Sequence, residues 1–215
     1  MALNINGTTG ISGGDGSVSA PALTGTDSNT GITFPAADTI KFATGGVERM
    51  SITNSGISGI SAGITMADQW RITTTFQVSS FAFITSNWER NDTTGYGKIG
   101  TGMSESSGEF SFPSTGIYLV RMVISWYADG GGVNYNRLSI QTTTNNSSYS
   151  SASFVYSGVE SSSQYNNMMA EILFDVTDVS THKVSFHSAA ATTISYDGSS
   201  SSNRTSATFI RLGDT

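Results

Sequence analysis

The two histidines are the residues of this chain best suited to chemistry near neutral pH, because a neutral imidazole can accept a proton or bind a metal ion. They are His182 and His187, in a segment whose alternating apolar residues predict a strand. A spacing of five residues places two side chains on opposite faces of a strand, so the pair cannot form one site unless a bulge intervenes. His182 shares its face with Val184 and Phe186, and we expect a core histidine with satisfied hydrogen bonds.

Paired carboxylates and glycine-rich loops are the other features that could support catalysis. Asp175 with Asp178, and Glu105 with Glu109, are separated by three or four residues across turns, which favours solvated side chains over an acid–base pair. Residues 129–133 contain three glycines but lack the Lys and Ser/Thr of a phosphate-binding loop, so we expect a hairpin tip. The nucleophile motif Gly-x-Ser-x-Gly does not occur. We therefore expect no catalytic residues, no enzymatic activity and no cofactor.

Metal binding has little support in the sequence. A calcium site built from Asp92, Asp129 or Asp197 is conceivable, but no oxygen-ligand spacing supports it. The chain has no cysteine, which excludes disulfides and thiolate ligands. We expect no metal site.

The composition is poor in charge and rich in hydroxyl groups. Charged residues make up 12% of the 215 residues, and the formal net charge is −6; an average soluble domain has about 25% charged residues. About 64 residues are Ser or Thr, while 37% are hydrophobic, enough to bury a core. The ten basic residues are not clustered, which argues against nucleic acid. No apolar run approaches the roughly 18 residues of a membrane span, and the N-terminus lacks the pattern of a signal peptide, so we expect no membrane insertion.

Residues 1–66 differ in kind from the rest and predict an extended stem. Glycine interrupts this part every few residues, and short β-prone segments lie between, at 31–34, 39–42 and 49–53. Such short strands do not close a core within one chain, so we expect them to pair with copies of the same chain. Residues 55–64 repeat Gly-Ile-Ser and predict an extended connector. The alternative is that the whole region is a flexible leader.

Residues 67–215 predict strands throughout and no helix. Positions 70–78 alternate with a period of two, and further strands are expected near 110–112, 137–143, 152–157, 168–177, 181–188, 192–197 and 205–212. The strand at 117–126 is largely apolar on both faces, which indicates that it is buried twice, once in its own core and once against something else. About ten strands joined by polar loops predict an all-β sandwich, a ten-stranded jelly roll.

One segment resembles a known family. Residues 107–120 read Ser-Gly-Glu-Phe-Ser-Phe-Pro-Ser-Thr-Gly-Ile-Tyr-Leu-Val. They resemble the signature of complement globular-head and tumour-necrosis-factor-like (TNF-like) jelly rolls, in which alternating Phe residues end in Pro and a long strand begins with Tyr. Those positions are Phe110, Phe112, Pro113 and Tyr118, with Gly116 in the turn. Residues 206–213, with Phe209, resemble the closing strand of that family. The resemblance covers about residues 68–215 and implies a jelly-roll knob that assembles as a tight homotrimer.

A trimer would explain the doubly apolar strand. The expected interface residues are Ile117, Leu119, Val123 and Trp126.

The first part of the chain resembles another group of proteins. The motifs lie at residues 19–32, 35–42 and 45–56, and the last contains Glu-Arg-Met-Ser-Ile. They are similar to a trimeric, β-rich stem module of bacteriophage tail-fibre and other virion proteins. This resemblance implies a virion protein whose residues 1–19 dock it to other proteins of the particle.

Three polar loops predict a binding surface. They lie at about 127–135, 144–167 and 196–203, and they combine tyrosines with Ser, Gly and Asn, as adaptable recognition surfaces do. The candidate ligand-binding residues are Tyr127, Tyr135, Tyr149, Tyr165, Tyr196 and Asn203. The alternative is that the loops are merely soluble and that the tyrosines are buried anchors.

The leading functional hypothesis is a homotrimeric phage tail fibre or spike, located in the virion, whose knob binds a glycan or protein of the host surface. The alternative is a capsid decoration or head-fibre protein with a structural role only. An enzyme such as a polysaccharide depolymerase is a third possibility, although such enzymes use longer β-helices with carboxylate clusters, and the sequence shows neither.

Overall fold

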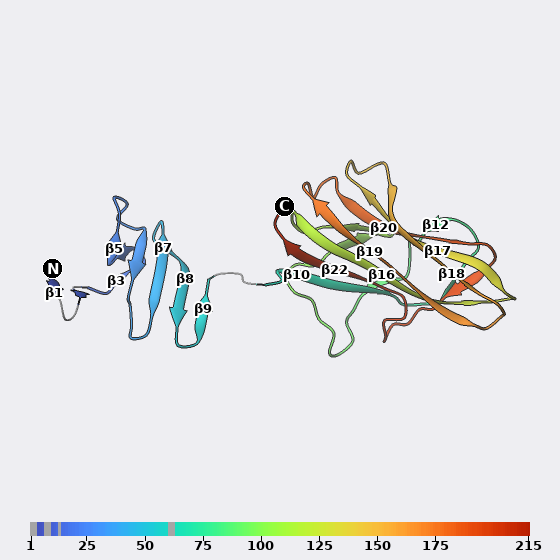
Figure 1. Ribbon diagram of the computed structural model, residues 1–215, viewed down its shortest axis with the longest axis horizontal. Helices are drawn as coiled ribbons and strands as arrows, with labels where there is room; N and C mark the ends of the chain where they lie inside the picture. Colours follow the sequence, from blue (N-terminus) through green and yellow to red (C-terminus); the bar gives the residue numbers. More distant parts are fainter. Residues whose placement is uncertain (1–3, 7–9, 13, 60–62) are drawn as a thin grey trace. The chain divides into compact units, whose positions relative to one another are not determined.

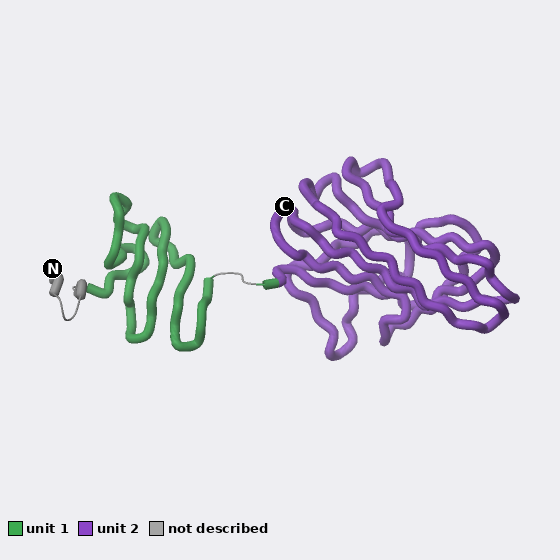
Figure 2. The backbone as a smooth tube through the Cα atoms, viewed as in Figure 1, with its two compact units in different colours: residues 1–63 green, residues 64–215 purple. Residues whose placement is uncertain are grey.

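A computed structural model describes residues 4–6, 10–12, 14–59 and 63–215 (Figure 1). The chain divides into two compact units, residues 1–63 and 64–215, close to the boundary expected after residue 66 (Figure 2). The regular elements of the described residues are all β-strands, which confirms the all-β prediction. In this part of the chain, no helix is long and apolar enough to cross a membrane.

The first unit is a series of small antiparallel pairings. Its main element is a five-stranded meander of β5 (Leu23–Thr24), β6 (Gly31–Thr33), β7 (Ile40–Thr44), β8 (Val47–Thr53) and β9 (Gly56–Ser58). Two shorter pairs precede it, β1 (Asn4–Asn6) with β2 (Gly10–Ser12) and β3 (Gly16–Ser17) with β4 (Ala20–Pro21). The connector expected at 55–64 forms strand β9 in part, and its residues 60–62 lie outside the described residues.

One face of the meander is apolar because apolar residues of neighbouring strands lie opposite one another. Ile32 lies opposite Phe42, which lies opposite Met50. Ile52 lies between Ile40 and Ile57 in the same way. All six side chains are exposed or only half-buried; among the described residues of this unit, the buried ones are Thr33, Ala43 and Ser51. This sheet is a single layer whose apolar face has no second layer in the described residues of the unit.

The second unit is a sandwich of two sheets. The first sheet runs in the order β11 (Phe76–Val78), β21 (Ile194–Tyr196), β16 (Gly116–Ala128), β22 (Ser206–Gly213), β10 (Met66–Ile72) and β13 (Trp88–Arg90), with β19 (Tyr165–Val176) along the other edge of β16. The second sheet runs in the order β14 (Ser104–Ser106), β15 (Glu109–Ser111), β20 (Lys183–Ala190), β17 (Val133–Thr143) and β18 (Ser150–Val159), and β12 (Ala82–Phe83) pairs with β20. All pairings are antiparallel.

The sandwich has more strands than the ten expected, because the chain bends within some of the expected strands and divides them into shorter ones. The alternating run 70–78 is not one strand: it breaks at residues 73–75, so that β10 pairs with β22 and β13 while β11 pairs with β21. The glycine-rich segment 129–133 is likewise not a hairpin tip. It carries the chain from β16 in the first sheet to β17 in the second.

The core lies between the two sheets and is rich in aromatic residues. Trp126, Tyr118 and Tyr196 from the first sheet are fully buried, as are Phe110 and Phe186 from the second. Two hydrogen bonds join the sheets. The Trp126 indole N–H donates to Ser157 Oγ at 3.0 Å in a partly buried bond, and the Tyr196 hydroxyl donates to Asn136 Oδ1 at 2.9 Å in a buried one. The polar tips of these large residues are therefore satisfied inside the sandwich.

A buried carboxylate anchors the long connection after β13. Asp68 is almost fully buried and accepts hydrogen bonds from Trp70 Nε1 at 3.0 Å, Arg90 Nε at 3.1 Å and the backbone N–H of Met103 at 2.8 Å. A Cβ at Gly102 would lie 2.6 Å from Asp68 Oδ2, which explains the need for glycine there. This network has a structural role and leaves no oxygen of Asp68 free for a ligand.

Candidate functional site

The outward face of the first sheet carries exposed and half-buried apolar side chains. It is formed by side chains of β16, β19 and β22, strands that lie side by side (Figure 1). Successive β16 residues alternate between buried and half-buried, so the even-numbered positions form the core and the odd-numbered ones face outward. We call this outward surface the apolar face.

The outward residues of the three strands lie opposite one another in rows that cross the apolar face, and we call these rows rungs. Leu119 lies between Leu173 and Ile210. Two positions further along, Arg121 lies between Glu171 and Thr208, and the next rung joins Val123 to Met169 and Ser206. Leu173 and Met169 are 66% and 54% exposed, values unusual for side chains of this kind.

Three of the four predicted interface residues lie on the apolar face. They are Ile117, Leu119 and Val123, which point outward from β16 and are half-buried. The prediction for Trp126 is wrong, because the even-numbered side chains of β16 point into the core. It is fully buried and cannot contact another subunit directly.

The predicted loop residues lie on three different surfaces and do not converge. Tyr127 and Tyr165 face each other across β16 and β19, with ring centroids 5.1 Å apart, at one end of the apolar face. Tyr135 is exposed on the outward side of the second sheet. The prediction that Tyr196 binds a ligand is wrong. This residue belongs to β21 and is fully buried, so it cannot touch a ligand.

Asn203 also belongs to a structural cluster. Its Nδ2 donates to Gln69 Oε1 at 3.4 Å, and Asn91 Nδ2 donates to the same oxygen. Gln69 Nε2 in turn donates to Thr208 Oγ1 at 3.0 Å. The amide of Asn203 thus fixes the last loop to β10 and β22.

Tyr149 is held by a charged partner. Its hydroxyl donates to Glu109 Oε1 at 2.5 Å, and Lys183 Nζ donates to the other carboxylate oxygen at 3.3 Å. The hydrogen bond from Tyr149, with help from Lys183, holds the pKa of Glu109 below its usual range despite partial burial. Burial and the adjacent carboxylate raise the pKa of Tyr149, so this pair stays as tyrosine and carboxylate at neutral pH. Neither group is poised for acid–base chemistry.

The two histidines differ in their surroundings. His182 is buried beside Phe174, and its ring nitrogens lie 3.3 Å from Thr177 Oγ1 and 3.1 Å from Thr181 Oγ1. His187 is buried beneath Phe81 and Phe83, and neither of its ring nitrogens has a hydrogen-bond partner. Burial, followed by the charge of Arg137, lowers the pKa of His187 to about 4. Within the described ranges, no three His, Asp or Glu side chains are grouped as metal ligands.

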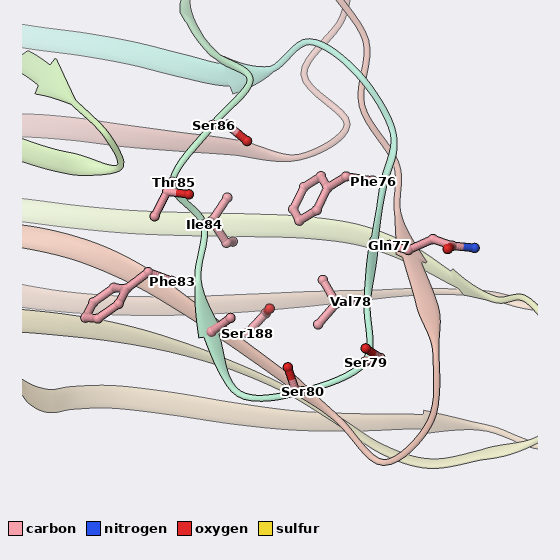
Figure 3. A pocket seen from close by; sticks show the side chains of 11 residues that line it. Phe76, Gln77, Val78, Ser79, Ser80, Phe83, Ile84, Thr85, Ser86 and Ser188 are labelled. Carbon is pink, nitrogen blue, oxygen red and sulfur yellow. The ribbon is translucent and has the colours of Figure 1, made fainter.

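A small hollow lies between β11 and β12 (Figure 3). Its volume is about 260 Å³, and Phe76, Val78 and Ile84 project into it, whereas Phe83 points away. Ser80 and Ser188 lie along its lower side in the view. The hollow is smaller than typical small-molecule sites, which run from about 300 to 1,000 Å³, so we place no ligand there.

No family model matches the chain, and no curated protein matches it. Among solved structures, that of Eiger TNF from S. frugiperda aligns with a TM-score of 0.55 at 15% identity, covering 71% of this chain and 96% of the other. The chain contains a TNF-like jelly roll. A crystal structure of murine APRIL at pH 8.5 aligns with a TM-score of 0.48 at 13% identity, covering 68% of this chain and 98% of the other.

The jelly-roll prediction is thereby confirmed, and the likeness concerns the fold alone. Within this TNF-like jelly roll, the sequence pattern indicated the outward residues of β16 but missed those of β19. Met169 and Leu173 are exposed and alternate with the buried or half-buried residues of this strand. The signal was present, because both faces of β19 contain large apolar residues, as both faces of β16 do.

Proposed function

We propose that this chain is a structural component of a bacteriophage virion, a short homotrimeric tail fibre or spike whose jelly-roll unit attaches the particle to the host-cell surface. The observation that carries the proposal is that each unit has an apolar sheet face that no described residue of the same unit covers. Association with copies of the same chain accounts for both faces at once. The motifs at 19–32, 35–42 and 45–56, which resemble stem modules of tail-fibre proteins, supply the viral context.

The apolar face of the jelly roll favours a second and third copy of this chain as its occupants. Burying a large apolar side chain contributes about 1.5–3 kcal/mol when the burial is complete. Leu173, Met169 and Leu212 are 66%, 54% and 49% exposed, so their burial would support a stable interface. The Arg121–Glu171 pair supplies the polar contact within this face.

The meander of the first unit favours the same arrangement. Its apolar face would be covered if three copies packed around a common axis, which would turn three single layers into one stem with a shared core. Residues 1–19, which include 1–3, 7–9 and 13 outside the described residues, would dock the stem to other virion proteins. Three knobs on one stem would then bind the host surface multivalently, so that weak individual contacts suffice.

The test combines oligomeric state with adsorption. Sedimentation equilibrium of the full chain is expected to give three times the chain mass at micromolar concentration, and a monomer would contradict the proposal. The purified trimer is then added to host cells before the phage that carries this chain. Competition should lower the rate of phage adsorption, whereas unrelated protein of equal charge should leave it unchanged.

A capsid decoration or head-fibre protein is the second candidate, because the motifs at 19–32, 35–42 and 45–56 resemble stem modules of other virion proteins as well as of tail fibres. It shares the trimer but lacks the receptor. Gold-labelled antibodies against the jelly roll would distinguish the two, because they would label the tail in the first case and the capsid in the second.

A further inference from the structure

The outward face of the second sheet has a continuous row of aromatic side chains on the opposite side of the sandwich from the apolar face. We call it the aromatic row; its members are Tyr149, Phe83, Phe81, Phe154, Tyr156 and Tyr135. Phe81, Phe154 and Tyr156 are 54%, 52% and 56% exposed. Exposed aromatic rings in this number mark a surface that contacts something.

The register of the strands explains why these rings share one face. Tyr156 lies opposite Arg137, and Phe154 lies opposite Ser139, on β18 and β17. On the other side of β17, His187 lies opposite Ser139 and also opposite Phe83 of β12. Because the residues that alternate with them form the core, all of these side chains must point away from the core.

Arg137 lies in the middle of the row. Its guanidinium carbon is 4.6 Å from the ring centroid of Phe154 and 5.6 Å from that of Phe81. Nη2 donates to Ser151 Oγ at 3.0 Å, while Nε is buried without any partner. Among the described residues, no carboxylate forms an ion pair with Arg137. A cation that lies against two rings and has no ion-pair partner among the described residues suits a charged acceptor.

Other polar atoms near the row are also unpartnered. Ser185 Oγ and both ring nitrogens of His187 are buried without hydrogen bonds, and both residues are on the outward side of β20. Together with Arg137 Nε, they make up four of the seven buried side-chain atoms of the described residues that have no partner. Such atoms are normally satisfied by protein, water or a ligand.

Among the described residues around the row, Arg137 is a cation without a counter-ion. Lys183, also on the outward side of β20, is paired with Glu109 at 3.3 Å. His187 is neutral at pH 7, because its burial and the nearby guanidinium lower its pKa to about 4. Glu109 is engaged by both Tyr149 and Lys183 and is not free to neutralise Arg137. A partner that is complementary in charge must therefore bring its own anionic group.

We propose that the aromatic row binds a carboxylate-bearing saccharide, with the carboxylate on Arg137 and sugar rings stacked on the neighbouring aromatic faces. The chemistry fits because the apolar faces of pyranose rings pack on aromatic rings, while an exposed hydroxyl such as that of Ser151 bonds sugar hydroxyls. An unpaired guanidinium selects an acidic sugar over a neutral one through two parallel charge-assisted hydrogen bonds. This proposal gives the ligand class of the attachment function proposed above and rests on it.

The experiment compares acidic saccharides with neutral analogues of the same shape. Trigalacturonic acid, an oligosaccharide containing glucuronic acid and sialyllactose are each titrated into the full-length protein beside the corresponding methyl esters, with binding followed by calorimetry and saturation-transfer NMR. At least one acid should bind at least ten times more tightly than its ester, and the difference should shrink as salt increases.

Variants locate the site. R137Q should abolish the preference for the acid while leaving residual binding of the ester, and F154A should weaken both ligands by at least threefold. R204Q is the matched control, because it removes the same charge from the Arg204–Asp197 pair and should bind as the wild type does. F154A and R204Q change exposed side chains, so loss of folding does not confuse the comparison.

Three outcomes would overturn the proposal. Two come from the titrations: no acid in the panel binds better than its ester, or R137Q retains the preference for the acid. The third is that another copy of the chain covers the row, which would be seen as protection of Tyr135 and Tyr156 from iodination only in the oligomer. The attachment function is judged separately, by competition for phage adsorption. If the wild type competes and R137Q competes equally well, attachment stands and the saccharide site is wrong. If the wild type does not compete, attachment fails whatever the saccharide titrations show.

Discussion

Arg121 and Glu171 lie directly opposite each other on β16 and β19, and Arg121 Nε donates to Glu171 Oε2 at 2.7 Å in the middle of the apolar face. Leucine, valine and methionine rungs lie on either side of this pair. Both charged side chains are about 40% exposed in the single chain and would lose most of their water in a trimer. In the proposed trimer, the apolar rungs would supply affinity and the charge pair would fix the orientation of the subunits.

Leu173→Glu tests the apolar rungs. Because Leu173 is largely exposed, the change should alter the free energy of unfolding of the isolated subunit by less than about 0.5 kcal/mol. In the interface, it places an uncompensated carboxylate among apolar side chains, and the trimer should dissociate to monomers at micromolar concentration. Light scattering after gel filtration measures the mass. Val179→Glu, an exposed valine outside the apolar face, is the control and should remain a trimer.

Glu171→Gln tests the charge pair. Removing one partner leaves Arg121 uncompensated in the interface, so the trimer should weaken by at least tenfold in dissociation constant. The double variant Arg121→Met with Glu171→Met replaces both charges by apolar groups and should restore or exceed the wild-type affinity. Sedimentation velocity over a concentration series gives the constants. Equal weakening by the single and double variants would show that the pair is not desolvated between subunits.

Alternation along strands made much of the sandwich predictable. The pattern of β16 located its core face, its outward face and three residues of the apolar face, because side-chain direction depends only on parity. The same parity shows why Trp126 is a core residue, since it shares its face with Tyr118 and Met122. Tyr196 was assigned to the loop 196–203, whereas it is the last residue of strand β21 and its side chain is buried in the core.

The aromatic row could not be predicted in this way. Its members come from β12 and the residue before it, from β17, from β18 and from the loop that precedes β18. They meet because β20 pairs with both β12 and β17, which are about fifty residues apart in the sequence. Long-range pairing of this kind leaves no local periodicity, so the isolated Phe81, Phe83 and Arg137 carry no signal until the sheet order is known.

Tyr196→Phe tests the buried bond that joins the two sheets. The change removes a hydroxyl that donates to Asn136 Oδ1 in the core and leaves that oxygen without this partner. We expect the free energy of unfolding to fall by about 1–3 kcal/mol, the cost of an unsatisfied buried polar group. Urea denaturation measures it. Tyr135→Phe removes an exposed hydroxyl from the same residue type and should change the stability by less than about 0.5 kcal/mol; an equal loss in both variants would contradict the structural role of the Tyr196 bond.

His187→Phe tests the buried histidine through the pH dependence of stability. The folded protein holds the pKa of His187 at about 4, below the unfolded value of 6.5, because burial and Arg137 disfavour the charged ring. The unfolded chain therefore takes up a proton first as the pH falls, so stability is fully present above about 6.5 and is lost between about 6.5 and 4.

We expect a loss of about 1–2 kcal/mol from this group, less than the full linkage because solvent screens the edge of the ring. Phenylalanine preserves an aromatic ring beneath Phe81 and Phe83 but cannot titrate, so urea denaturation of the variant should show a correspondingly smaller decline from pH 7 to pH 4. Parallel declines in the two proteins would show that His187 does not contribute.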